Sequence, residues 1–356
     1  MPTRIWLTYK QHRFETIAIT VLCLGLAAAG LIEAFRLFAL HTPVACLGNG
    51  GSINIFAGPV AGTVTAPTGI DPCVVPLNAR YALTGSLDFT LVGMLFIFAP
   101  FIAGLTFGAP LVARELEQGT APLSWSLAGS RRRWLLIRML AMAGLLVVLL
   151  GAVAIASDVY QGTLNPTVDV HASFETYSYR GVMEIFWGLA AFLGTVALGT
   201  IFGRTLPAVF VAVVICFFAR AGWENVVNQV ALQPMGQLLA DPAKMSDPNF
   251  NYLYPPSDLM LSWPMYLDGK PWSGDMNVWY QQNMPLDANG QPTNVDTNGQ
   301  LLGTDGKPLS MPQSVPFGLH GNQYWPVVAL ESAILFAGAL LCGAVALFWV
   351  DRRRPY

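Results

Sequence analysis

Charged side chains inside long apolar stretches are the residues of this sequence best suited to chemistry, because an ionised group in such a setting is costly unless it is paired or hydrated. Six of them lie within or at the ends of four such stretches: Glu33, Arg36, Glu184, Arg220, Glu224 and Glu331. Glu33 and Arg36 are three residues apart and Arg220 and Glu224 four, so each acid can meet its base along one helix. The spacing therefore predicts two ion pairs within helices.

Glu331 differs because no basic residue lies within helical reach of it in its own apolar stretch. It requires water or a partner from another helix, and Arg36 and Arg220 lie at similar depth on helices from which they can approach it. We predict that Glu331 faces protein or a hydrated vestibule rather than lipid. Two interpretations of the charged residues stay open, namely a polar vestibule on a substrate pathway and structural ion pairing between packed helices.

Motifs of catalysis and of nucleotide binding are missing from the sequence. There is no G-x-x-x-x-G-K-[ST] phosphate loop, no H-E-x-x-H zinc motif and no G-x-S-x-G nucleophile motif. The four histidines fall in four separate polar regions, which disfavours a metal site. The formal net charge of −2 argues against a nucleic-acid partner. We expect a protein that is not an enzyme and holds no cofactor or metal.

Composition indicates a membrane protein. Hydrophobic residues make up 54% of the chain and charged residues only 11%, against roughly 25% charged in soluble domains. Runs of about 20 apolar residues can cross a roughly 30 Å hydrocarbon core as helices. These runs are Ile17–Leu40, Phe89–Ala113, Trp134–Ala156, Val182–Phe202, Thr205–Trp223 and Trp325–Val350. We predict an all-α polytopic fold with an N-terminal in-plane helix before the first of six spans.

The distribution of lysine and arginine predicts the orientation of the spans. If the spans alternate, most basic residues fall in short connections on one side, such as Arg131-Arg132-Arg133 and the C-terminal Arg352-Arg353-Arg354. The longer loops 41–88, 157–181 and 224–324 fall on the other side and carry few. By the positive-inside rule, both termini are cytoplasmic and the protein is a multi-pass protein of the plasma membrane.

This orientation also places Cys46 and Cys73 on the oxidising face, in the first outer loop. The remaining cysteines, Cys23, Cys216 and Cys342, lie in apolar runs. We therefore predict a disulfide between Cys46 and Cys73.

The segment 224–324 is the largest polar stretch. It is rich in aromatic residues such as Trp263, Trp272 and Trp279, in which disordered segments are poor, so we expect a small folded extracellular cap. Asp268-Gly269 within it is typical of tight hairpin turns. A calcium-loop interpretation of residues 287–290 lacks the later oxygen ligands and the final glutamate. The expected organisation is 1–223 for the in-plane helix and spans one to five, 224–324 for the cap, and 325–356 for the last span and basic tail.

The connection between the second and third spans carries the most distinctive sequence. Ala113-Arg114-Glu115-Leu116-Glu117 is followed by Gly119-Thr120 and by Arg131-Arg132-Arg133-Trp134, which indicates a short charged helix that ends at Gly119. The stretch resembles the corresponding loop of actinobacterial type-2 ABC exporter permeases. Weaker similarity to the same family includes Trp6 to Arg13, Arg204 to Ala208 and Tyr324-Trp325-Pro326.

The resemblance implies a function. In this family the loop after the second span supplies the coupling helix that docks on the ATPase, and that role falls on Arg114, Glu115, Glu117, Gly119 and Thr120. The chain is then the permease half of an exporter of an amphiphilic substrate, most simply a homodimer in the lipid membrane. A separate cytoplasmic ATPase binds ATP and Mg²⁺ and hydrolyses the ATP.

Two other classes of protein fit a polytopic chain without an ATPase. A secondary transporter driven by an ion gradient would place ionisable residues near the bilayer midplane, whereas the charges here lie toward the outer ends of the spans. A non-transport scaffold or sensor would signal through the cap. A neighbouring gene for a phosphate-loop ATPase would argue against the scaffold.

Overall fold

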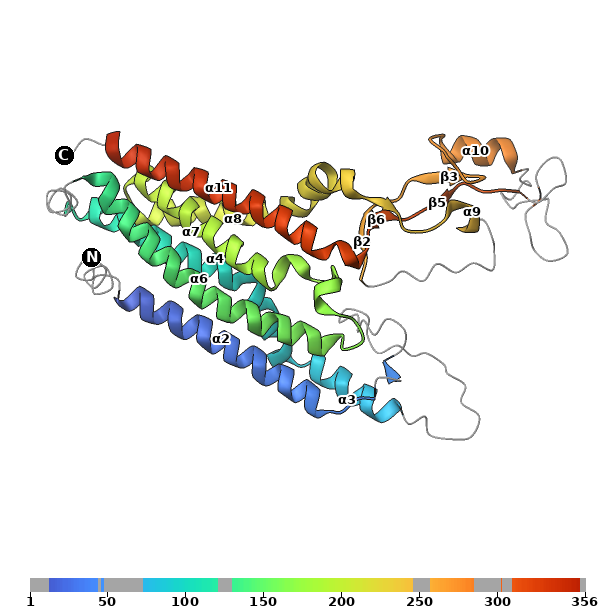
Figure 1. The fold of residues 1–356 in the computed structure, drawn as a ribbon, viewed down its shortest axis with the longest axis horizontal. Coiled ribbons are helices and arrows are strands. Elements are labelled where there is room, and N and C mark those ends of the chain that lie inside the picture. Colours follow the sequence, from blue (N-terminus) through green and yellow to red (C-terminus); the bar gives the residue numbers. More distant parts are fainter. Residues whose placement is uncertain are drawn as a thin grey trace. The chain divides into compact units, whose positions relative to one another are not determined.

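The computed structural model of the protein describes residues 13–43, 46–47, 73–120, 130–245, 257–284, 302 and 309–352. Two compact units make up the chain (Figure 1). The first, which we call the helical unit, combines Met1–Glu224 with Asn322–Tyr356, and the second, the strand unit, is Asn225–Gly321. The in-plane helix predicted before the first span lies outside the described residues.

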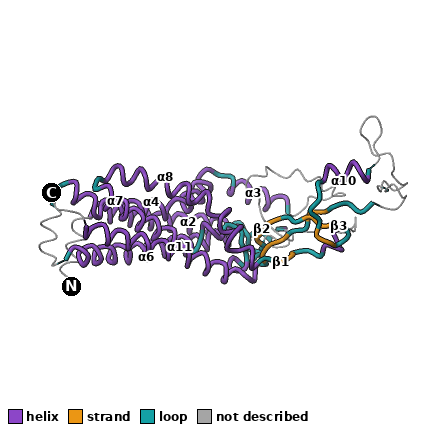
Figure 2. Tube along the Cα trace, turned by 90° about the horizontal axis from the view of Figure 1, so that it is seen from above, coloured by secondary structure: helices purple, strands orange, loops and turns teal. Residues whose placement is uncertain are grey.

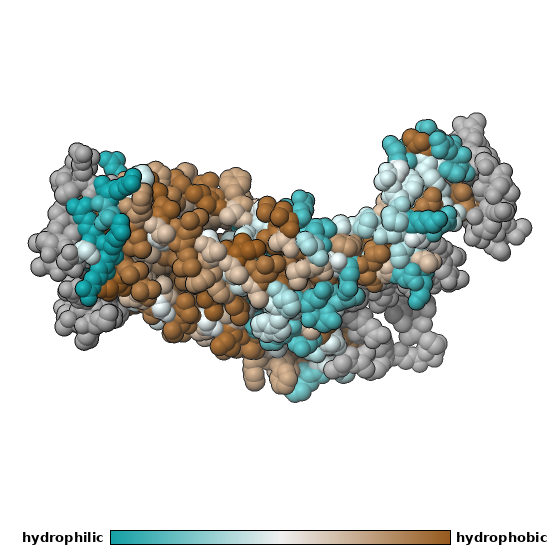
Figure 3. Space-filling model, turned by 45° about the horizontal axis from the view of Figure 1, so that its top comes forward, coloured by the Kyte–Doolittle hydropathy of each residue, from teal (hydrophilic) through white to brown (hydrophobic). Residues whose placement is uncertain are grey.

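Six helices in the described part of the chain are long and apolar enough to cross a membrane. They are α2 (Arg13–Ala39), α4 (Leu87–Glu117), α6 (Arg131–Leu164), α7 (Val182–Phe202), α8 (Thr205–Val226) and α11 (Tyr324–Arg352). Hydrophobic side chains form a broad band over these helices (Figure 3). The prediction of six apolar spans is confirmed, and the protein is a multi-pass membrane protein.

The charged residues after Ala113 are helical and their helix ends at Gly119 as predicted, but that helix is the second span itself. Helix α4 continues without a break to Glu117, past two internal prolines, and ends where Gly119 adopts a φ of +69°. The left-handed conformation of Gly119 is the usual way in which a glycine terminates a helix. The charged residues are therefore the last turn of the second span.

Close contact between α4 and α7 is made possible by glycine. A Cβ atom at Gly104 would lie 2.5 Å from the carbonyl oxygen of Gly188, and one at Gly108 would lie 2.6 Å from that of Phe192. Neither position can hold a side chain without displacing the backbone of α7. Small residues at such spacing let transmembrane helices approach closely, so this glycine pair fixes the centre of the bundle.

Ion pairs connect helix ends that are distant in the sequence. Arg114, near the end of α4, contacts Glu15, near the beginning of α2, at 2.9 Å, and Arg132 at the start of α6 contacts Asp351 at the end of α11 at 2.7 Å. The beginning of α2 and the end of α11 thus lie at the same end of the helical unit (Figure 1). These contacts agree with the alternation of the spans that the orientation argument assumes.

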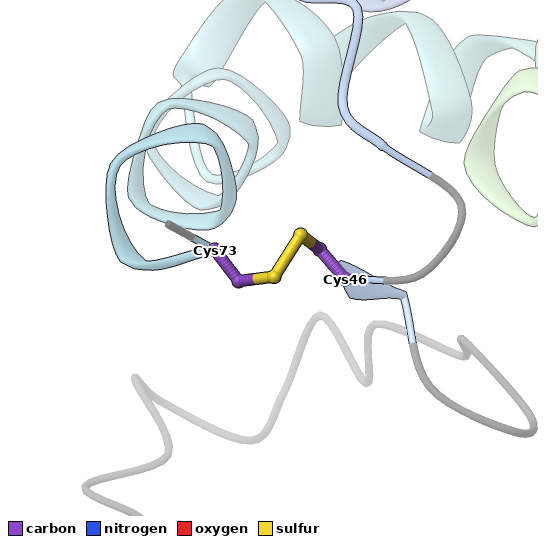
Figure 4. Close-up of a disulfide and its surroundings, with 2 residues drawn as sticks. All are labelled: Cys46 and Cys73. Carbon is purple, nitrogen blue, oxygen red and sulfur yellow. A yellow bond between two sulfur atoms is a disulfide. The ribbon is translucent and has the colours of Figure 1, made fainter. Parts of the chain in front are cut away.

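A short helix, α3 (Val74–Thr84), precedes α4, and Cys73 immediately before it forms a disulfide with Cys46 (Figure 4). Its Arg80, 3% exposed, donates to the carbonyl oxygens of Thr163 and Leu164 at 2.6 and 2.7 Å. A cation that caps the last carbonyls of a helix is favourable. Arg80 therefore ties α3 to the C-terminal end of α6.

We expect the disulfide to stabilise the protein appreciably. The cysteines are 27 positions apart, and closing a loop of this size is worth roughly 3 kcal/mol in the chain-entropy description. Cys46→Ser should lower the unfolding temperature of the purified protein, and a reductant should lower it for the wild type but not for the variant. Maleimide labelling of both cysteines in unreduced protein would contradict the bond.

The strand unit makes the fold mostly helical rather than all-α, as Figure 2 shows by its colouring. One antiparallel sheet has the order β1-β6-β2 and the other β4-β3-β5. The strands are β1 (Gln237–Leu238), β2 (Leu259–Ser262), β3 (Met265–Leu267), β4 (Lys270–Pro271), β5 (Gln313–Ser314) and β6 (Phe317–Leu319). Two short helices, α9 (Pro242–Met245) and α10 (Met276–Asn283), complete the unit. Short strands joined by turns suit a proline-rich segment, since proline cannot donate within a central ladder.

The Asp268-Gly269 turn is present as predicted. It joins β3 to β4, with φ values of +51° and +74°, and Leu267 pairs with Lys270 across it. Positive φ at both central residues defines the tight hairpin turn that Asp-Gly favours. Residues 287–290 of the calcium-loop interpretation lie outside the described residues.

Candidate functional site

Glu331 lies at the centre of a buried polar cluster in the helical unit. Its side chain is fully buried, and its carboxylate accepts hydrogen bonds from the Tyr177 hydroxyl at 2.7 Å and from the Trp223 indole N–H at 3.0 Å. Glu331 therefore faces protein, and Trp223 is its partner from another helix. Two neutral donors bond its oxygens, and the described contacts give Glu331 no ion pair with Arg36 or Arg220, although Arg220 lies close enough to interact with it electrostatically.

Arg220 and Glu224 form the predicted ion pair along α8, at 3.2 Å. Ser178 bridges them, since its oxygen accepts from Arg220 at 3.0 Å and its hydroxyl donates to Glu224 at 3.2 Å. Tyr179 also donates to Glu224, at 3.3 Å, and the Arg220 guanidinium lies 4.1 Å from the centroid of its ring. The connection between α6 and α7 is thereby joined to α8.

We call these seven residues the polar cluster: Tyr177, Ser178, Tyr179, Arg220, Trp223, Glu224 and Glu331. Burial, and then the negative charge of Glu331, raise the pKa of Tyr177 above its ordinary value. Burial likewise raises the pKa of Tyr179. Both phenols therefore keep their protons across the physiological range and act as hydrogen-bond donors. Three segments that are far apart in the sequence meet in this network.

The other two intramembrane acids stand apart from the polar cluster. Glu33 pairs with Arg36 at 2.7 Å, as the spacing predicted. Glu184, 1% exposed in the first turn of α7, has no well-oriented hydrogen-bond partner among the described residues. Ser157 lies near Glu184, but its hydroxyl donates to the carbonyl oxygen of Ala154 at 3.0 Å instead of to the carboxylate. The six charged residues of the spans therefore do not form one pathway in the described contacts.

The last turn of α4 and the residues that follow it, Arg114–Thr120, form what we call the coupling segment. Glu115 is 8% exposed and contacts Arg138 of α6 at 2.5 Å, so its carboxylate is engaged within the bundle rather than offered to a partner protein. The Arg138 guanidinium also lies 4.4 Å from the centroid of the Trp134 ring. Thr120 folds back, its N–H donating to the Glu115 carbonyl at 3.0 Å.

Glu117 is the exposed carboxylate of this segment. It accepts hydrogen bonds from the Thr205 backbone N–H at 3.3 Å and from the Thr205 hydroxyl at 3.1 Å. Thr205 is the first residue of α8, and a carboxylate at the start of a helix is favourable because it compensates unpaired N–H groups. Glu117 thus connects the end of α4 directly to α8, whose other end carries the polar cluster.

Replacing Glu331 by glutamine tests the polar cluster. The amide keeps one acceptor oxygen for the Trp223 N–H, but its N–H₂ group makes the Tyr177 hydroxyl an acceptor, so the buried phenolic proton loses its acceptor, at about 1–3 kcal/mol. We expect Glu331→Gln to lower the unfolding temperature, with Asp351→Asn, an exposed acid on the same helix, as the control. If both the unfolding temperature and transport stayed unchanged, Glu331 would serve neither in the substrate pathway nor in holding the helices together.

Residues 59–228 match a family described as ABC-2 membrane transporter related. The matched segment includes α4, α6 and α7, and with them the coupling segment and part of the polar cluster. The match supports an ABC-2 type permease, a membrane subunit that is generally not catalytic itself. No curated protein and no solved structure matches the chain.

Proposed function

We propose that this protein is the membrane-spanning permease subunit of an ATP-driven exporter that moves an amphiphilic substrate outward. The match of residues 59–228 to the ABC-2 transporter family carries this proposal. It is supported by six helices long and apolar enough to span a membrane, and by the lack of a phosphate loop in the sequence. ATP is then hydrolysed by a separate cytoplasmic subunit.

The assembly that we propose contains two permease chains and two ATPase chains in the plasma membrane. Both termini are cytoplasmic and the strand unit is extracellular, as the positive-inside rule predicts. The basic helix ends, Arg114 and Arg132 among them, then face the ATPase. We propose a homodimer as the simplest arrangement that supplies two permease halves.

Glu117 is the residue through which we propose that the ATPase acts. Glu115 is engaged with Arg138, so an ATPase that pushes on the coupling segment acts on its exposed residues. Glu117 connects that segment to Thr205 at the beginning of α8. A displacement of the coupling segment is thereby passed to the helix that carries Arg220 and Trp223. Such a change requires contacts that differ between the two states of the transporter.

Glu117→Ala should therefore uncouple ATP hydrolysis from transport while the helices stay folded. The side chain is exposed and its hydrogen bonds are worth about 0.5–1.5 kcal/mol each, so the loss of stability should be small. Substrate-stimulated ATPase activity of the reconstituted complex is the measurement, and Asp351→Asn is the matched control. If Glu117→Ala retained full partner binding and full coupled transport, the coupling segment would be an ordinary charged helix end.

The proposed function as a whole is tested by purification from the native membrane. An ATPase with a phosphate loop should co-purify, and substrate efflux from cells should stop when that ATPase is inactivated. Efflux that persists without the ATPase and collapses with the ion gradient would support a secondary transporter instead. A chain that purifies without an ATPase and mediates no efflux would fit a scaffold or sensor.

A further inference from the structure

A turn of π-helix follows α8 directly. It is formed by Val227–Leu232, which we call the π segment, and it leads into a short 3₁₀ helix, Gln233–Met235. One helical stretch thus runs from Thr205 to Met235. A π-helix has i→i+5 hydrogen bonds in place of the i→i+4 bonds of an α-helix, and it is rare outside single turns within α-helices. The π segment therefore carries about one residue more than α-helical turns would need.

The spacing of the buried residues explains the extra residue. Val227 and Leu232 are the buried residues of the π segment, 4% and 0% exposed, and they are five positions apart. Five α-helical positions turn the chain through roughly 500°, which would place the two side chains about 140° apart. With i→i+5 hydrogen bonds they lie one above the other. The π segment lies beside β2, and its geometry lets both apolar side chains point to one side.

The helical stretch is held at both ends. Thr205 at its beginning is bonded by Glu117, and Leu232 near its other end is fully buried. The part between them is loosely packed, since only 11% of its most apolar window is buried, against 61% for α7. A helix that is fixed at both ends cannot turn as a rigid body. Its middle can turn only if the extra residue of the π segment moves along the helix.

Two hydrogen bonds of the polar cluster depend on the position of this extra residue. Trp223, four positions before the π segment, donates to Glu331, and Arg220 donates to Ser178. If the π turn moved past these two residues toward Thr205, each would shift by about 1.5 Å and turn by roughly 100°. Both donors would then leave their acceptors. The observed position of the π segment is therefore the one that keeps the polar cluster closed.

We infer that the π segment is a moving joint, whose extra residue migrates along α8 from a position after Trp223 to one before Arg220 and so opens the polar cluster. Both positions keep the same number of helical hydrogen bonds, so the contacts of these two side chains decide between them. The inference rests on the proposed function, because it gives a displacement that enters at Glu117 a route along α8 to the polar cluster.

Deletion of Gln229 removes the extra residue. Gln229 is exposed, and without it Val227 and Leu232 become four positions apart, which is one face of an ordinary α-helix. The deletion variant should keep both side chains buried and unfold at a temperature close to that of the wild type. Gln229→Ala, which changes the side chain but keeps the chain length, is the matched control. A strongly lowered unfolding temperature of the deletion variant alone would overturn the assignment of an extra residue.

Hydrogen exchange in the purified permease, without any ATPase, tests the movement. A migrating π turn breaks and re-forms the backbone hydrogen bonds that it passes, so amides of residues 219–226 exchange through it. Trp223→Phe removes one bond of the closed position and should speed this exchange by about two- to tenfold, the equivalent of one hydrogen bond. In the variant that lacks Gln229 the same substitution should have little effect, because no extra residue is left to move. Equal acceleration with and without Gln229 would overturn the joint.

The assembled transporter tests the use of the joint. Addition of ATP and Mg²⁺ should speed exchange in residues 219–226 of the wild type and of Gln229→Ala, but not of the deletion variant. An equal response of the deletion variant would overturn the role of the joint in coupling. If ATP had no effect on the wild type while the permease alone behaved as expected, the exporter would be removed and the joint would stand.

Discussion

Replacement of Glu115 by alanine should destabilise the helical unit by about 3–5 kcal/mol, the usual cost of removing one partner of a buried ion pair. Arg138 would be left 6% exposed, without the carboxylate that lies 2.5 Å from it. The Trp134 ring beside it can offset only part of this loss, because a cation–π contact is weaker than a desolvated charge pair. We expect a strongly lowered unfolding temperature and reduced yield of folded protein in detergent.

A second ion pair at the same end of the bundle serves as the control. Arg132 and Asp351 are 2.7 Å apart, but their side chains are 63% and 44% exposed. An exposed pair is typically worth about 0–1 kcal/mol, so Asp351→Ala should have almost no effect on unfolding. Equal effects of Glu115→Ala and Asp351→Ala would show that the burial of Glu115 does not decide its importance. Arg138→Met in the Glu115→Ala background should recover part of the loss, because it removes the buried charge that has lost this carboxylate.

The sequence contained a signal for the inward position of Glu115 that the interpretation as a coupling helix missed. Gly104, Gly108, Leu111 and Glu115 follow one another at intervals of three or four residues, and all four are buried. Helical periodicity extended past Ala113 would have placed Glu115 on the core face of α4. The interpretation as a coupling helix instead offers this carboxylate to the ATPase. In a membrane helix, an acid on the buried face indicates a buried partner.

The spans themselves could be predicted because length and apolar content decide whether a helix can cross a bilayer. The ion pairs within one helix followed from spacing alone, as Glu33 with Arg36 and Arg220 with Glu224 show. Partners of Glu331 could not be predicted, because which residues meet across helices depends on helix rotation, which no local pattern fixes. Its donors are a tyrosine and a tryptophan, and neither residue type is specific to such a role.

The glycines illustrate the same limit. Gly25 and Gly338 lie in runs of small residues that indicate close helix packing, yet a Cβ atom at either position would meet open space. A Cβ atom at Gly104 or Gly108, by contrast, would lie 2.5 or 2.6 Å from a backbone oxygen of α7. Small residues show where helices can approach, and the partner helix determines whether they do.

Arg180, which the sequence marks only as one basic residue in an outer loop, is the centre of the connection between α6 and α7. It is 2% exposed, and its guanidinium donates to the carbonyl oxygens of Val170, Ser173 and Glu175 at 2.5, 2.8 and 3.3 Å. It also pairs with Asp158 at 3.2 Å. A planar group with several fixed donors suits this set of acceptors, and lysine cannot reproduce it.

Arg180→Met should therefore cost several kcal/mol, on the order of 3–5, because it leaves a carboxylate and several carbonyl oxygens without their donor. Arg180→Lys should recover only part of the loss, since an ammonium has three donors and no fixed plane. Arg204→Met, at an exposed arginine, is the control for removal of a positive charge.

Thermal unfolding gives the overall effect, and hydrogen exchange across residues 165–181 locates it. Because Tyr177, Ser178 and Tyr179 belong to the same connection, Arg180→Met should also raise exchange in the polar cluster. Protection of these residues at the wild-type level in Arg180→Met would mean that the connection holds its conformation without its central cation.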